Sequence, residues 1–313
     1  MAQEKLSAEA FLALQRSIED LRSALRERGI SIADEDGLAH FAPKVRDFMP
    51  EVTKIFKTAQ FYEWRQTTFP AMEVDPNYTI PDLQYTFGRT PIKAVPEVRG
   101  WERAVSLNGF FAECRNLAGT VTLPDFPACT TASEMFSRCT LLEELTTGNF
   151  PLVTNLQGYA NSCQFLRKIS FGSMPKVVNI RTFCYANPEL RQVFLREGVA
   201  PQGDCGYAFG QCPRLERIDG VVDFSQATIL DNAFVGCSSL EEVRIKGLKS
   251  SLQLNDSPKL SAESLRYLID NATETRGGVI TLSSQLSTRD ELKETLEYVG
   301  AKAVDKGFSV VYR

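Results

Sequence analysis

The sequence holds a single histidine, His40, among 313 residues, and this scarcity argues against most hydrolytic chemistry. A hydrolytic triad needs a histidine or another base beside its nucleophile. No C-x-x-C pair is present, so a zinc site is not expected either. No phosphate-binding or dinucleotide-binding glycine motif follows an expected strand. We therefore predict a non-enzymatic protein that uses no metal and no cofactor.

Long apolar runs and an excess of basic residues are also missing. No apolar run reaches the roughly 18 residues that a membrane helix needs, so we expect no membrane insertion. The net charge of −4 argues against nucleic acid as a partner, because a phosphate backbone calls for a basic surface. The N-terminus, MAQEKLSAEAFLALQRSIED, carries acidic residues where a signal peptide would have its basic and apolar regions. This favours a virion component released by lysis over a secreted adhesin.

A repeat of 24 or 25 residues runs through the middle of the chain. Its register mark is a cysteine, replaced once by asparagine: Cys114, Cys139, Cys163, Asn187, Cys212 and Cys237. A period of this size is typical of a solenoid, in which each coil buries its apolar side by stacking on the next. Side chains at equivalent positions point the same way and not at each other, so we interpret the cysteines as buried free thiols.

Apolar residues keep phase with these marks. A leucine follows every mark by three residues, as at Leu142 and Leu166. An aromatic residue precedes most marks by three residues: Phe111, Phe136, Phe209 and Phe234. A bulky or apolar residue precedes every mark by thirteen: Trp101, Phe126, Phe150, Met174, Val199 and Phe224. Offsets that recur in this way predict one coil per repeat, with these side chains in a shared core.

The phrases EMFSRCTLLEEL, FPLVTNL, MPKVVNI and AFVGCSSLEEVRI resemble the leucine-rich repeats of the BspA-like type. The resemblance covers about residues 86–260. It departs from the repeat pattern at Asn187, where cysteine is expected, and at Ala160 and Cys184, where phenylalanine is expected. Such repeats occur in bacterial surface proteins and in tail-associated proteins of bacteriophages. The resemblance therefore implies a leucine-rich-repeat solenoid that works in binding or adhesion, and it names no ligand.

We predict an α+β chain built around a β-solenoid of about six to seven coils. The expected parts are a helical anchoring segment (1–50), an aromatic-rich N-terminal cap (51–85), the leucine-rich-repeat solenoid (86–260) and an α/β C-terminal cap (261–313). In the last part we expect a helix capped by Ser261, a strand at 279–282, a second helix after a capping box of Thr288 and Glu291, and a strand at 308–312. We expect this cap to leave little apolar surface for a partner.

The short strand of each coil should expose one residue to solvent, because side chains alternate along a strand. The predicted exposed file is Thr122, Thr146, Ser170, Phe194, Asp219 and Arg244. Phe194 lies at its centre, between basic steps, and is our main candidate for binding. The alternative is a scattered apolar residue on a solvated ladder. The full set of predicted binding residues is Phe194, Arg191, Arg167, Lys168 and Arg244.

The N-terminal helix is predicted to carry a narrow apolar seam: Phe11, Leu14, Ile18, Leu21 and Leu25. A helix of this length is marginal in water without a partner. The seam either packs on its own chain or joins the protein to an assembly, including a homo-oligomer. The function that we predict is a structural and recognition component of a phage tail or related virion part, with other virion proteins and a host-surface protein or glycan as partners. The alternatives are a bacterial cell-surface adhesin and an intracellular protein-interaction scaffold.

Overall fold

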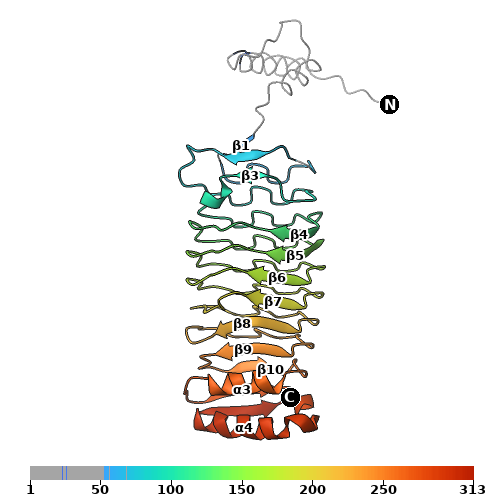
Figure 1. Ribbon diagram of the computed structural model, residues 1–313, viewed down its shortest axis with the longest axis vertical. Helices are drawn as coiled ribbons and strands as arrows, with labels where there is room; N and C mark the ends of the chain where they lie inside the picture. Colours follow the sequence, from blue (N-terminus) through green and yellow to red (C-terminus); the bar gives the residue numbers. More distant parts are fainter. Residues whose placement is uncertain (1–22, 24–25, 27–52, 56, 68) are drawn as a thin grey trace, which may run out of the picture. The chain divides into compact units, whose positions relative to one another are not determined.

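The computed structural model describes residues 23, 26, 53–55, 57–67 and 69–313. The chain divides into two compact units, Met1–Thr53 and Lys54–Arg313. The second unit winds into a β-solenoid of about 9 turns, whose coils succeed one another along the column in Figure 1. Of the predicted N-terminal helix only residues 23 and 26 are described, both in helical conformation, and the seam lies outside the described residues. Among the helices that are described, none is long and apolar enough to cross a membrane.

Three sheets follow one another along the solenoid. The first contains β1 (Thr53–Ile55), β2 (Met72–Val74) and β3 (Val98–Arg99), after which comes the short 3₁₀ helix η1 (Trp101–Arg103). The second contains β4 (Gly119–Thr122), β5 (Leu142–Thr146), β6 (Lys168–Phe171), β7 (Gln192–Leu195), β8 (Arg217–Asp223) and β9 (Glu242–Lys246). The third contains β10 (Leu252–Leu254), β11 (Gly278–Leu282) and β12 (Phe308–Tyr312). The strands of the second sheet pair in parallel, as coils wound in one direction require.

A further ladder of backbone hydrogen bonds joins the coils in the turns that precede the register marks. The N–H of Phe111 donates to the carbonyl of Met135 in the next coil at 2.9 Å. The N–H of Phe61 makes the equivalent bond to Thr86 at 3.0 Å. The register therefore extends backward to a mark at Thr90 and to one more coil before it. Much of the predicted aromatic cap is thus part of the column itself.

The register marks are buried hydrogen-bond donors. The Sγ of each cysteine mark donates to the carbonyl three residues before the preceding mark, namely Cys114 to Phe87 (3.0 Å), Cys139 to Phe111 (3.2 Å), Cys163 to Phe136 (3.1 Å), Cys212 to Cys184 (3.0 Å) and Cys237 to Phe209 (3.1 Å). A carbonyl in the core needs such a partner, and a thiol is small enough to provide it there. All the cysteines are free and buried, which confirms their interpretation as thiols.

An aromatic stack runs through the core beside these thiols. Neighbouring rings are 5.5 Å apart for Phe61 and Phe87, 5.7 Å for Phe87 and Phe111, 5.4 Å for Phe111 and Phe136, and 5.5 Å for Phe209 and Phe234. At Ala160 and Cys184 the repeat lacks its phenylalanine. The residues just before them, Tyr159 and Phe183, are fully buried, and their rings are 6.1 Å apart. These two rings occupy the core where the repeat pattern is broken.

Two residues in each turn have left-handed backbone angles, five and one residues before the mark. Most are not glycine, as shown by Glu134 (φ 55°), Arg138 (φ 59°) and Ala186 (φ 58°). This conformation costs an L-residue about 1–2 kcal/mol. The cost is offset by the cross-coil hydrogen bonds that the conformation allows, such as that from the N–H of Arg138 to the carbonyl of Asn161 at 2.9 Å.

The C-terminal part contains the predicted first helix and both predicted strands. Helix α3 (Ala262–Asp270) begins at Ser261, whose hydroxyl accepts from the N–H of Ser264 at 3.1 Å. Strands β11 and β12 lie where the sequence placed them.

The predicted capping box is wrong. Two 3₁₀ helices, η2 (Ser284–Thr288) and η3 (Asp290–Leu292), precede α4 (Lys293–Asp305). The hydroxyl of Thr288 donates back to the carbonyl of Gln285 at 2.8 Å, and Glu291 pairs with Arg289 at 2.8 Å. The side chains of Thr288 and Glu291 are therefore engaged in local turn contacts and do not form a capping box.

Candidate binding surface

The outward side of strands β4–β9, which we call the strand face, carries the predicted exposed file. Strand register aligns Thr122, Thr146, Ser170, Phe194 and Asp219 across neighbouring strands. The residues that precede them in their strands, such as Leu145, Ile169 and Val193, are buried. The strands therefore alternate between core and solvent, and a regular row of outward side chains results.

Phe194 is the large apolar residue in this row. Its side chain is 41% exposed, and its neighbours across the strands are the polar residues Ser170 and Asp219. The Gln192 amide donates to the Asp219 carboxylate, which fixes the acidic neighbour of the ring. A phenylalanine among hydroxyl and carboxylate groups can lose much of its contact with water when a partner covers it.

Ion pairs join successive coils at the start of the strands. Arg167 pairs with Glu143 at 3.4 Å, and Arg191 pairs with Glu216 at 2.9 Å. All four side chains are about half exposed, so each pair adds little to stability. The two arginines of the predicted basic steps are therefore already paired with carboxylates of the same chain, and a partner that binds these arginines has to compete with those carboxylates.

Lys168 differs from the two arginines. Strand register places it between Glu144 of β5 and Gln192 of β7. No ion pair of Lys168 is found with any residue of the described part of the chain. Its ammonium group is the exposed cation on the strand face that is best placed to meet an acidic group of a partner.

The file is interrupted in β8, which corrects the predicted neighbourhood of Arg244. Ile218 lies opposite Val243, but Val221 lies opposite Arg244, so Asp219 and Gly220 form a bulge. Gly220 has φ 107°, a conformation that glycine accepts readily. The prediction that Asp219 and Arg244 are adjacent members of one file is wrong, because a bulge adds residues to one strand only.

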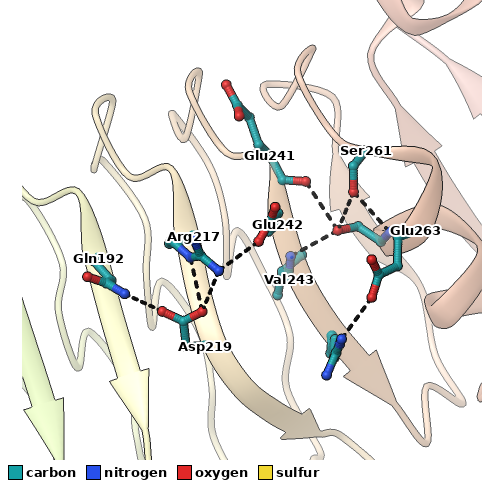
Figure 2. A network of polar contacts seen from close by, with 10 residues as sticks. Gln192, Arg217, Asp219, Glu241, Glu242, Val243, Ser261 and Glu263 are labelled. Carbon is teal, nitrogen blue, oxygen red and sulfur yellow. Dashed lines mark hydrogen bonds and ion pairs between the residues drawn. The ribbon is translucent and has the colours of Figure 1, made fainter. Parts of the chain in front are cut away.

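A polar hollow of about 290 Å³ lies beside this bulge. Figure 2 shows Arg217 between Asp219 and Glu242, and the distances from its guanidinium to these carboxylates are 2.9 and 3.0 Å. Arg244 pairs with Glu263 of α3 at 2.8 Å, and its guanidinium lies 5.9 Å from the ring centre of Tyr267. The charged side chains that line the hollow thus bind one another, as expected of a solvated polar network.

Helix α3 ends the second sheet at the edge of β9. The N–H of Val243 donates to the hydroxyl of Ser264 at 3.0 Å, and the N–H of Ser261 donates to the carbonyl of Glu241 at 2.9 Å. The edge of the strand face is therefore closed by the chain itself.

A second polar surface lies near the N-terminal end of the solenoid, and sequence reasoning missed it. A chain of ion pairs connects Glu63 to Arg89 (2.9 Å), Arg89 to Glu113 (3.3 Å) and Glu113 to Arg138 (3.6 Å). Burial alone raises the pKa of Glu113, but hydrogen bonds from Arg115 and Arg89 outweigh it and hold the pKa below its ordinary value. The four members of the chain of ion pairs each lie one residue before a register mark, and their alternating sign is the signal that could have revealed them: Glu63, Arg89, Glu113 and Arg138.

The surface offers little for catalysis within the described residues. No group of three or more histidine, cysteine, aspartate or glutamate side chains is arranged there to hold a metal ion. Burial raises the pKa of Cys163 to about 12, so its thiol stays protonated near neutral pH and is a poor nucleophile. His40 and the predicted assembly residues Phe11, Leu14, Ile18, Leu21 and Leu25 lie outside the described part of the chain.

Comparison with known families assigns the repeats. Residues 107–216 and 174–255 match the family described as BspA type leucine rich repeat region, in 6 copies. The matched stretch contains β4–β9 and therefore the whole strand face. Neither the curated proteins nor the solved structures searched gave a match to the chain.

Proposed function

We propose that this chain, a BspA-type leucine-rich-repeat protein, is a recognition protein that binds a protein partner through its strand face. The observation that carries this proposal is the exposed ring of Phe194 at the centre of a regular row of polar side chains. Leucine-rich-repeat solenoids generally serve protein binding. An aromatic residue ringed by polar groups is also the arrangement in which burial by a partner contributes most to affinity.

The charges around Phe194 favour a partner with both acidic and basic groups. Arg191 and Glu216 form one exposed pair, and Lys168 has an exposed ammonium nearby. A carboxylate of the partner can pair with the Lys168 ammonium directly. To pair with Arg191, the same carboxylate has to displace Glu216 from the existing ion pair. Such contacts set specificity and association rate more than affinity.

At a finer level, we propose that the protein is part of a virion, associated with a phage tail, and that the strand face meets a host-surface protein or glycan. The acidic balance of the chain, with net charge −4, supports a role away from nucleic acid. The apolar seam predicted for residues 1–50 would supply the attachment to other virion proteins. A bacterial cell-surface adhesin and an intracellular scaffold are the alternative roles for the same binding face.

Mass spectrometry of purified particles tests the virion assignment. We expect this chain to co-purify with intact particles through density-gradient centrifugation and to remain after a high-salt wash. Its absence from particles, combined with its presence on the surface of intact bacterial cells, would establish the adhesin in place of the virion protein.

Binding of host cells tests the strand face separately. The variant Phe194→Ala with Arg191→Glu should bind host cells at least about tenfold more weakly than the parent. A matched control is Ile229→Ala with Arg181→Glu, since Ile229 is 40% exposed and Arg181 pairs with Asp204 at 3.2 Å on the separate ladder of bridges. We expect the control to bind like the parent. Binding by the Phe194→Ala with Arg191→Glu variant that equals binding by the parent would place the contact elsewhere, on a terminal domain.

A further inference from the structure

One edge of β12 pairs with no other strand of the described chain. β12 pairs with β11 and is the final strand of the third sheet. Arg313 directs its N–H toward β11, where it donates to the carbonyl of Leu282 at 2.9 Å. Because backbone groups alternate in direction along a strand, those of Phe308, Val310 and Tyr312 face away from β11. In the described chain no strand pairs with β12 on that side.

This open edge contrasts with the end of the second sheet, where α3 bonds the edge of β9. Proteins commonly protect a free edge with a charged residue, a proline or a bulge. Strand β12 reads FSVVY and has none of these, and its pairing with β11 is regular over its whole length. An unprotected edge of this kind is a template for another strand.

An apolar hollow of about 610 Å³ lies beside the same edge. Its lining includes Leu296, Gly300 and Val304 from one stripe of α4, together with Val310 and Tyr312 from β12. Val304 is 73% exposed, the largest exposed fraction among the large apolar side chains described. This overturns the expectation that the C-terminal cap leaves little apolar surface. The cap closes the second sheet, whereas none of the described residues covers the cap's own end.

Gly300 indicates that the backbone of another element packs against this end. It lies in the middle of α4, where glycine is unfavourable compared with alanine. A Cβ added at Gly300 would meet nothing within 4 Å, so packing inside this chain gives no reason for a glycine. A glycine with open space above it allows the backbone of another element to approach closely.

We propose that this end docks a second copy of the same chain, related by a two-fold axis that passes near Val310 and Gly300. β12 then pairs antiparallel with β12 of the other copy. Val310 lies opposite itself and Phe308 lies opposite Tyr312, which uses all the outward backbone groups of the edge. The third sheet thereby continues across the two copies.

The helix fits the same symmetry. Leu296 and Val304 stand four residues on either side of Gly300. When α4 crosses its copy antiparallel at Gly300, Leu296 of each copy faces Val304 of the other and covers that exposed side chain. Strand and helix are thus self-complementary about one axis. That shared symmetry is the reason to favour a second copy over an unrelated partner.

Disulfide trapping tests the register. In an antiparallel pair bonded in this way the opposed Cα atoms are about 5.5 Å apart, within the range of a disulfide. The full-length Val310→Cys variant, oxidised with diamide, should run mainly as a linked dimer on a non-reducing gel. The matched control Val311→Cys lies opposite Ser309 of the other copy and not opposite itself, so it should link at least about tenfold less. The native thiols give little background, because burial raises the pKa of Cys163 and Cys205 to about 12.

Analytical ultracentrifugation tests the helix contact. The parent should be a dimer, Gly300→Ala should dissociate at least about tenfold more readily, and Val304→Glu should be monomeric with an unchanged circular dichroism spectrum. The control Ile80→Glu, at a site that is 67% exposed elsewhere on the column, should remain dimeric. The proposal is overturned if the parent is monomeric or if disulfide trapping is equal at positions 310 and 311. It is also overturned if Val304→Glu remains a dimer and Leu14→Glu abolishes that dimer, because the contact then lies in the N-terminal seam.

Discussion

Asn187 donates a hydrogen bond from Nδ2 to the carbonyl of Ala160, one coil earlier, at 2.8 Å. The cysteine marks make the equivalent bond through Sγ, so the one departure from cysteine keeps the contact that defines the register. The amide makes two hydrogen bonds in addition. Nδ2 also donates to the carbonyl of Cys184 at 2.9 Å, and Oδ1 accepts from the N–H of Cys163 at 2.7 Å.

This relationship predicts unequal effects of two substitutions at Asn187. Asn187→Cys keeps a donor for the Ala160 carbonyl and should lower the free energy of unfolding by about 1–2 kcal/mol. Asn187→Leu has a similar volume but leaves the buried carbonyl of Ala160 and the N–H of Cys163 without partners, so it should cost about 3–5 kcal/mol. Urea denaturation of both variants measures the difference. Equal losses would contradict the role of the register mark as a donor.

The leucine after each mark should contribute through packing alone. Leu166 is fully buried, and Leu166→Ala should reduce the free energy of unfolding by about 2–5 kcal/mol. Leu141 is the matched control, because it is 41% exposed and Leu141→Ala should change stability by less than about 0.5 kcal/mol. Thermal and urea unfolding monitored by circular dichroism compare the two. A small effect at Leu166 would mean that the coils do not stack as described.

The left-handed turns predict a substitution that stabilises the protein. Ala186 has φ 58°, so Ala186→Gly should relieve strain and raise the free energy of unfolding by about 1 kcal/mol. Ala118 is also accessible but is not among the positive-φ residues, and Ala118→Gly should destabilise by about 0.5–1 kcal/mol. Opposite signs in chemical denaturation support the described turns, whereas a destabilised Ala186→Gly would contradict them.

Buried thiols predict a loss of stability at high pH. Burial raises the pKa of Cys163 from an ordinary value near 9.0 to about 12. Between these values the unfolded thiol ionises while the folded one keeps its proton, so the unfolded state binds fewer protons and stability falls as pH rises. In Cys163→Ala this contribution is absent, and stability should fall less steeply from about pH 9 to pH 12. If the free energy of unfolding falls equally steeply with pH in the parent and the variant, the folded state does not raise the pKa of this thiol.

The repeat could be predicted from the sequence because Cys139, Cys163 and their equivalents mark the coils at even spacing. The coil marked by Thr90 was missed, since a hydroxyl replaces the thiol there and donates to the carbonyl of its own coil, at Phe87, at 2.7 Å. Its residue at the leucine offset is Lys93, so this coil has neither the cysteine nor the leucine by which the other coils were recognised.

On the candidate surface, the outward position of Phe194 followed from alternation along β7. The bulge at Asp219 and Gly220 could not be predicted from this alternation, because the repeat length stays at 25 residues while the register between β8 and β9 shifts. Gly220 was the available signal. The exposure of Val304 could not be read from α4 either, since it depends on which element lies beyond the last coil.

The central claim is that the strand face, and not another side of the coils, meets the partner. Photo-crosslinking measures this most directly, with a benzoylphenylalanine placed at position 194 and, as the matched control, at position 229, both about 40% exposed in the parent. After irradiation on host cells, we predict a discrete crosslinked product from position 194 and none from position 229. Products from position 229 with none from position 194 would contradict the assignment of the strand face as the binding surface.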